Sequence, residues 1–185
     1  MATAARRLLT GEEFLAIEFP SDTKAELDNG TIRMMSGGTV RHARLQGNIQ
    51  FSLREKLRGS GCTSFGSDMA VRVHGLSIRY PDVSVYCGKG GPENDKLKSS
   101  DDPKMVVEVL SPTTRIDDET VKLREYLALQ SLSHIMFVDP DSETIRLFRR
   151  ADGEGWFDTM VENGAEVVLD GFGISLTWAE IFARD

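Results

Sequence analysis

Apolar residues recur at helical spacing in one long stretch of the chain, residues 40–58. They lie four residues apart at Leu45, Ile49, Leu53 and Leu57, which places them on one face of a helix. Gly59-Ser60-Gly61 follows and is expected to end it. Near the N-terminus, Thr10-Gly-Glu-Glu13 has the form of a capping box. The pattern therefore predicts a long amphipathic helix at 40–58 and a short helix that opens after Thr10.

Strand-like runs occupy much of the remaining sequence. Asp28-Asn29-Gly30 lies between two such runs, and Asn-Gly in this position predicts a β-hairpin. Runs of apolar and β-branched residues predict further strands at 68–73, 80–87, 106–110, 133–138, 144–149 and from 167 onward. Asp139-Pro140-Asp141 joins the runs at 133–138 and 144–149, which are expected to form a second hairpin.

Two more helices are expected in the second half of the chain. Ser111-Pro112 breaks the strand pattern, and Asp117 or Asp118 can cap a helix that runs to about residue 130. A short helix is expected at 178–182. Strands and helices in this order predict an α/β (α+β) fold, in which helices flank a mixed β-sheet, built as a single domain over residues 1–185.

The composition is that of a soluble globular protein, with 40% hydrophobic and 28% charged residues. No apolar stretch approaches the roughly 20 residues that a membrane span requires, and residues 1–10 lack the apolar core of a signal sequence. A cytoplasmic location without membrane contact is therefore expected. In such a compartment Cys62 and Cys87, which lack metal-ligand spacing, are expected to be reduced thiols rather than a disulfide.

The net charge of −7 disfavours a protein that coats nucleic acid non-specifically, because phosphate neutralisation supplies most of that affinity. It is compatible with a local basic face, however. Arg41 and Arg44 begin a cluster of basic residues in the helix predicted at 40–58. Two interpretations of this cluster stay open: an ordinary solvated helix surface and a contact with nucleic acid.

Two acidic residues interrupt otherwise apolar strand sequences. Asp82 lies in the run at 80–87, and Glu108 shares a strand face with the apolar Val106. Ionised carboxylates in such surroundings are costly unless they are paired or bind a cation. Asp82 and Glu108 therefore predict a site for Mg²⁺ or Mn²⁺, with water and the Val109 carbonyl completing the coordination.

The spacing of these acids resembles a known nuclease signature. Pro81-Asp82, followed by Glu108 after 25 intervening residues, is similar to the PD-(D/E)XK pattern. In that superfamily the Asp and Glu bind magnesium, and a Lys two residues after the Glu orients the attacking water. Leu110 occupies the position of that lysine here.

A more specific resemblance, to the Uma-two family of restriction-endonuclease-like proteins, spans nearly the whole chain. It rests on Ala25-Glu26-Leu27-Asp28-Asn29-Gly30, Tyr80-Pro81-Asp82-Val83, Val107-Glu108-Val109-Leu110-Ser111-Pro112, Lys122 with Tyr126, and Phe137-Val138-Asp139-Pro140. The resemblance implies a restriction-endonuclease-like fold. It also implies that the lysine role passes to the helix that follows the glutamate strand.

In that helix Lys122 lies one turn before Tyr126, so its stem can run inward, and the alternative is an ordinary solvent-facing lysine. Glu26 corresponds to the family's acidic residue before the first hairpin turn. It is either a second-metal or water-mediated ligand or a plain hairpin side chain. His42 is either a group that contacts phosphate or transfers protons, or a surface histidine at a helix end.

Together these residues predict an Mg²⁺-dependent endonuclease that hydrolyses phosphodiester bonds, with DNA as the expected substrate. The resemblance implies a product that carries a 5′-phosphate. A homodimer is expected, because cutting both strands of a duplex needs two sites. Two other functions stay open. One is a nuclease-like domain that binds nucleic acid or a protein partner without cutting, and the other is a metal-dependent hydrolase of a small phosphorylated molecule.

Overall fold

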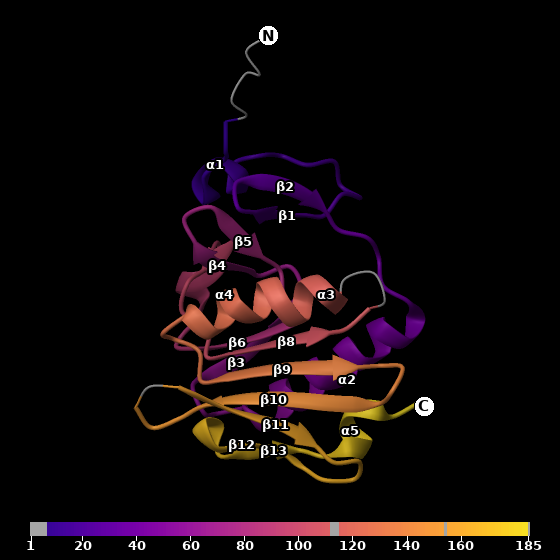
Figure 1. The fold of residues 1–185 in the computed structure, drawn as a ribbon. Helices are drawn as coiled ribbons and strands as arrows, with labels where there is room; N and C mark the ends of the chain where they lie inside the picture. The colour runs from indigo at the N-terminus through magenta and orange to yellow at the C-terminus, as the bar shows by residue number, and fades with distance from the viewer. Residues whose placement is uncertain (1–6, 112–114, 154, 185) are drawn as a thin grey trace.

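A six-stranded mixed sheet forms the centre of the computed structural model, which describes residues 7–111, 115–153 and 155–184 (Figure 1). Its strands are, in spatial order, β11 (Trp156–Val161), β10 (Thr144–Arg150), β9 (His134–Asp139), β8 (Met105–Val109), β6 (Val83–Cys87) and β3 (Cys62–Gly66). Neighbouring strands are antiparallel except β8 and β9, which run parallel. The predicted mixed sheet and the β9–β10 hairpin are confirmed.

Helices cover both faces of this sheet (Figure 1). One face carries α2 (Val40–Lys56) and α5 (Trp178–Phe182), and the other carries a helical segment made of α3 (Arg115–Asp117), the π-helical turn η2 (Asp118–Lys122) and α4 (Leu123–Ala128). Alternate residues of β8 serve the two cores: Val107 packs with the α2 side, and Val106 packs with Tyr126 of α4. None of the described helices is long and apolar enough to cross a membrane.

A second, smaller sheet is built mainly from the N-terminal half of the chain. Its strand order is β2 (Thr31–Met34), β1 (Ala25–Asp28), β5 (Ser77–Arg79), β4 (Ala70–His74) and β7 (Ser99–Ser100). Helix α1 (Gly11–Leu15) opens at the predicted Thr10 capping box. The predicted β1–β2 hairpin is confirmed, and its turn places Asn29 and Gly30 at φ 45° and 76°, where an ordinary side chain is strained. The remaining elements are η1 (Pro92–Asn94), β12 (Val167–Leu169), η3 (Asp170–Phe172) and β13 (Ile174–Leu176).

The strand predicted at 80–87 is shorter than expected, because residues 80–82 form the crossing between the two sheets. Strand β5 of the small sheet ends at Arg79, and β6 of the large sheet begins at Val83. Pro81 lies between them and has no backbone N–H to donate to a strand ladder. Asp82 therefore stands immediately before β6, where the chain crosses between the sheets, and its predicted place within a strand is wrong.

The predicted start of the next helix is also wrong. The helical segment begins at Arg115, whose N–H donates to the Ser111 carbonyl over 2.9 Å. Asp118 consequently lies within the segment rather than at its cap, and only 2% of it is exposed. Pro112, which was expected to break the strand pattern, lies outside the described residues.

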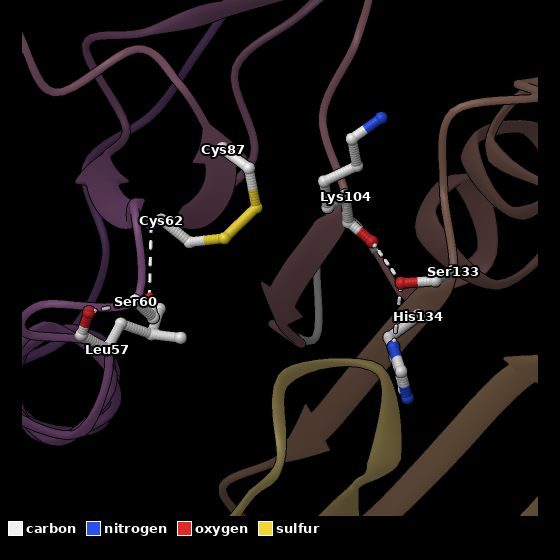
Figure 2. The surroundings of a disulfide bond; sticks show 7 residues. All are labelled: Leu57, Ser60, Cys62, Cys87, Lys104, Ser133 and His134. Carbon is white, nitrogen blue, oxygen red and sulfur yellow. Dashed lines mark hydrogen bonds between the residues drawn. A yellow bond between two sulfur atoms is a disulfide. The ribbon is translucent and has the colours of Figure 1, made fainter.

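Cys62 and Cys87 form a disulfide, so the expectation of free thiols is wrong (Figure 2). The two residues are direct partners in the antiparallel β3–β6 pair, with Cα atoms 3.9 Å apart. Directly opposed residues on neighbouring antiparallel strands bring their side chains together. That register is a property of the folded sheet, and nothing in the separation of 25 residues reveals it.

Removal of this bridge is expected to lower the free energy of unfolding by about 3–4 kcal/mol, because the open unfolded chain gains entropy over a loop of this size. Thermal denaturation of the wild type and a Cys62→Ser/Cys87→Ser variant, with and without dithiothreitol, measures the effect. Reductant should lower the melting temperature of the wild type alone. An equal response of both proteins would show that the bridge contributes no stability.

Candidate active site

A cleft of about 800 Å³ opens beside the point where the chain crosses from the small sheet to the large one. Its walls come from β1, the end of β8, the start of α2, the turn η2 and the loops that follow β2 and β9. It brings together the predicted catalytic and metal-binding residues, which are Glu26, Asp82, Glu108, Val109 and Lys122. Residues that are up to 96 positions apart in the sequence thus share one surface hollow.

Asp82 and Glu108 enter the cleft through the pairing of β6 with β8. Val83 is opposite Val107 in that antiparallel pair, so Asp82, which precedes Val83, comes close to Glu108, which follows Val107. The Val109 N–H donates to Asp82 Oδ2 over 2.8 Å, which holds the carboxylate beside the end of β8. The Asp82 carbonyl in turn accepts from the Gln46 side chain of α2 over 3.0 Å.

Lys122 points inward from η2 and is only 8% exposed, so the solvent-facing alternative is wrong. Its Nζ lies 3.0 Å from Asp118 Oδ1, 3.2 Å from Glu108 Oε1 and 3.5 Å from Glu26 Oε1. Burial alone would lower the pKa of this ammonium, but the three carboxylates outweigh burial and raise the pKa above its ordinary value. Lys122 is therefore a buried, positively charged donor among acids.

Glu108 is 3% exposed, and its Oε1 also accepts a hydrogen bond of 2.7 Å from the Tyr126 hydroxyl. Burial raises the pKa of Glu108 above its ordinary value. Lys122 opposes this rise, and the neighbouring carboxylates add to it. Two donors from one helical segment, Lys122 and Tyr126, thus fix the orientation of the glutamate.

The variant Tyr126→Phe is expected to lower the free energy of unfolding by about 1.5–3 kcal/mol, because it removes a buried hydrogen bond to a charged group. Tyr86→Phe is a matched control. Tyr86 is equally buried, but its hydroxyl makes no hydrogen bond to a charged group among the described residues. Urea denaturation should show a loss for Tyr126→Phe that clearly exceeds the loss for Tyr86→Phe, and equal losses would contradict this view of Glu108.

Glu26 is not a plain hairpin side chain, since it is 6% exposed and paired on both carboxylate oxygens. Its Oε1 accepts from the Tyr80 N–H over 3.0 Å, and its Oε2 lies 3.4 Å from the Arg79 guanidinium. Asp82 directly follows Tyr80-Pro81 in the segment that crosses between the sheets. This segment therefore holds both Glu26, through the Tyr80 N–H, and Asp82 at the cleft.

His42 lies in the first turn of α2 and lines the cleft, with 17% of its side chain exposed. Its Nε2 is 3.3 Å from Asp82 Oδ2, and the hydrogen bond to Asp82 raises the pKa of the imidazole against the opposing effect of burial. The Val109 backbone raises the pKa of the ring further. The surface-histidine alternative is therefore wrong.

The two arginines predicted to contact nucleic acid occupy different places. Arg41 lines the cleft and forms ion pairs with Glu143 at 2.9 Å and Asp141 at 3.7 Å. Arg44 is exposed on α2 and does not line the cleft. Any contact of Arg44 with a ligand would thus lie outside the hollow that contains the acidic residues.

Asp118 and Tyr126 are site residues whose contacts the sequence reasoning missed. Asp118 was expected only as a helix cap, and Tyr126 was named only beside Lys122 in a family motif. The four-residue spacing of Asp118 and Lys122 was the available signal, because side chains so spaced meet on a helix. The Tyr126 hydroxyl had no comparable signal, since its partner Glu108 is on another element.

The oxygen donors of the cleft suit a hard divalent cation. Asp82 and Glu108 offer carboxylates and Val109 a backbone carbonyl, a donor set typical of Mg²⁺ or Mn²⁺ rather than Zn²⁺. Three carboxylates, those of Glu26, Glu108 and Asp118, share the single ammonium of Lys122. Among the side chains that the structure describes, however, no group of three or more His, Cys, Asp or Glu is arranged as a metal site.

Fold and site together define a protein of the restriction-endonuclease-like class. A crystal structure described as "a putative nuclease belonging to DUF820" from Anabaena variabilis superposes with a TM-score of 0.73, at 18% identity over 95% of this chain and 98% of the other. The model of the Uma2 family, described as "Putative restriction endonuclease", matches residues 11–179, and the chain belongs to this family. The resemblance inferred from the motifs is thus confirmed.

Two relatives come from Synechocystis sp. and are both named as uncharacterized proteins. The protein slr1290 is 29% identical over 168 residues, which cover 90% of this chain and 87% of the relative. The protein sll1609 is 24% identical over 169 residues, which cover 90% of this chain and 96% of the relative. Both matches extend over nearly the full length of either partner, so the family likeness is not confined to a short motif.

Proposed function

We propose that the protein is a metal-dependent endonuclease that hydrolyses phosphodiester bonds of nucleic acid, with DNA as the substrate. One observation carries the proposal: the Lys122 ammonium lies 3.2 Å from Glu108 and 3.5 Å from Glu26, although Leu110 occupies the usual lysine position. The helix thus supplies the lysine ammonium that the glutamate strand lacks. The description of the family and that of the Anabaena neighbour support the same class of reaction.

In this proposal Asp82, Glu108 and the Val109 carbonyl hold Mg²⁺ or Mn²⁺. When bound, such a cation polarises a phosphoryl oxygen and lowers the pKa of water. Lys122 orients the attacking water with its N–H groups and offsets negative charge that develops on the phosphate. Tyr126 keeps Glu108 in one orientation, and Glu26 assists by directing the Lys122 ammonium.

The partner and assembly proposals follow from this chemistry. His42 and Arg41 line the cleft beside the acids, and we propose that they contact phosphate groups near the reacting one. A homodimer would supply the second site that cleavage of both strands requires. We also propose a cytoplasmic location, and the Cys62–Cys87 bridge is the feature that weighs against a reducing compartment.

Cleavage of supercoiled plasmid, single-stranded DNA, RNA and the small diester bis(p-nitrophenyl) phosphate, each with Mg²⁺, Mn²⁺ or chelator, tests the function. We expect metal-dependent cutting of plasmid and its loss in Asp82→Asn. Asp158→Asn is the control, because Asp158 of β11 pairs with Arg146 of β10 and does not line the cleft.

Each other outcome of this assay points to a different function. A wild type that binds metal but cuts none of the four substrates would contradict the proposal and favour the domain that binds without cutting. Turnover of the small diester alone would favour a hydrolase of a small phosphorylated molecule.

A further inference from the structure

Arg79 is a buried cation that the proposed reaction does not use. It ends β5, is 3% exposed and makes four polar contacts with three carboxylates. Its Nε and Nη2 donate to Glu125 over 2.6 and 2.9 Å, its Nη2 also donates to Asp28 over 2.9 Å, and its Nη1 donates to Glu26 over 3.4 Å. Burial alone would lower the pKa of Arg79, but these acids raise it, so the guanidinium stays charged.

The partners of Arg79 belong to two different elements, and of these partners Glu26 and Asp28 line the cleft. Glu125 lies on α4, between Lys122 and Tyr126 in the sequence, whereas Glu26 lies on β1 of the small sheet. The direct contact of Lys122 with Glu26, at 3.5 Å, is longer than a strong charge-assisted hydrogen bond. The bidentate pair of Arg79 with Glu125 is therefore the stronger connection between the helix and the small sheet.

We propose that Arg79 is a positioning residue, which holds Glu26 and the helix turn of Lys122 and Tyr126 at a fixed separation. A planar guanidinium can do this because it donates two parallel hydrogen bonds to one carboxylate and has further N–H groups that point toward another acid. Lysine keeps the charge but cannot reproduce that geometry. The expected effect on cleavage rests on the proposed nuclease function, whereas the fixed separation of Glu26 and the helix turn does not.

Two variants test the proposal, Arg79→Lys and the milder Glu125→Gln, which removes one charge and keeps the side-chain shape. Arg146 and Asp158 form a matched control pair, since they are also bidentate, at 2.9 and 2.6 Å, but do not line the cleft. We expect Arg79→Lys and Glu125→Gln to lower kcat by about 10- to 100-fold with little change in KM, because a misplacement of about 1 Å costs that much. Arg146→Lys and Asp158→Asn should stay within about twofold of the wild type.

A second measurement follows the geometry without any substrate. In protein labelled with ¹⁵N-lysine, the buried and paired Lys122 ammonium should give a slowly exchanging NMR signal, assigned by its absence in Lys122→Met. Glu125→Gln should abolish slow exchange of this signal, and Asp158→Asn should preserve it. The Glu125→Gln variant keeps this test valid even if Arg79→Lys does not fold.

The outcomes separate this inference from the proposed function. If the wild type cuts no nucleic acid, the proposed function fails, and the Lys122 signal still decides whether Arg79 positions the helix. If the wild type cuts and both Arg79→Lys and Glu125→Gln keep kcat and the slow Lys122 signal, the inference fails while the function stands. Equal losses of kcat in the test and control pairs would also overturn it.

Discussion

Replacement of Lys122 by methionine is expected to lower the rate of metal-dependent nucleic-acid cleavage by about 100- to 1,000-fold, because a preorganised cation is removed from the site where phosphate charge develops. The same change leaves Glu26, Glu108 and Asp118 without their common partner. Breaking a buried ion pair by removal of one member costs about 3–5 kcal/mol of folding free energy. Urea denaturation and cleavage rates per folded molecule measure the two effects separately.

Lys56→Met is the control for this experiment. Lys56 also pairs with a glutamate, Glu180 at 2.7 Å, but it is more exposed and lies outside the cleft. Exposed pairs contribute about 0–1 kcal/mol, so the control should lose little stability and no activity. Full activity of Lys122→Met would show that the lysine role has not moved to the helix, while leaving the Asp82 and Glu108 metal site possible.

Glu108→Gln is expected to abolish cleavage, by at least about 100-fold, while leaving the protein as stable as the wild type or more stable. Burial and neighbouring carboxylates raise the pKa of Glu108, so its ionised carboxylate costs folding free energy that the pair with Lys122 only partly offsets. Glutamine removes that charge, and its carbonyl oxygen can still accept from Tyr126 and Lys122. Stability would thus be maintained or gained as activity is lost.

Thermal denaturation at neutral pH and cleavage assays on the same preparation measure both sides of this prediction. Glu180→Gln is a suitable control, because Glu180 closes the capping box of α5 and does not line the cleft. It should lose a little stability and keep its activity. Cleavage by Glu108→Gln at the rate of the wild type would show that Glu108 has no role in the reaction. Unfolding of the variant would contradict the expectation that loss of the buried charge does not destabilise the fold.

Local patterns in the sequence were sufficient for the features that depend on neighbouring residues. The four-residue spacing of Leu45, Ile49 and Leu53 predicted α2, and Asn29-Gly30 predicted the first hairpin. Alternation along β8 placed Glu108 on the face of Val106, which is the face that α4 covers. Together with the family motifs, this is why the residues that line the cleft were identified before their geometry was known.

Features that depend on pairing between distant elements were not predictable in the same way. The Cys62–Cys87 bridge follows from the β3–β6 register, and the position of Asp82 follows from the crossing between two sheets. No role was predicted for Arg79, because its partners lie on β1 and α4. Such contacts exist only once strands of different sheets and a helix have been brought together.

The most direct test of the central claim is the Mg²⁺ dependence of plasmid cleavage by the wild type, assayed beside Glu108→Gln purified in the same way. The account predicts cutting by the wild type with Mg²⁺, no cutting with chelator, and no cutting by the variant under either condition. Equal Mg²⁺-dependent cleavage by both proteins would contradict the role proposed for Glu108. Metal-independent cleavage by the wild type would contradict the role proposed for Asp82 and Glu108.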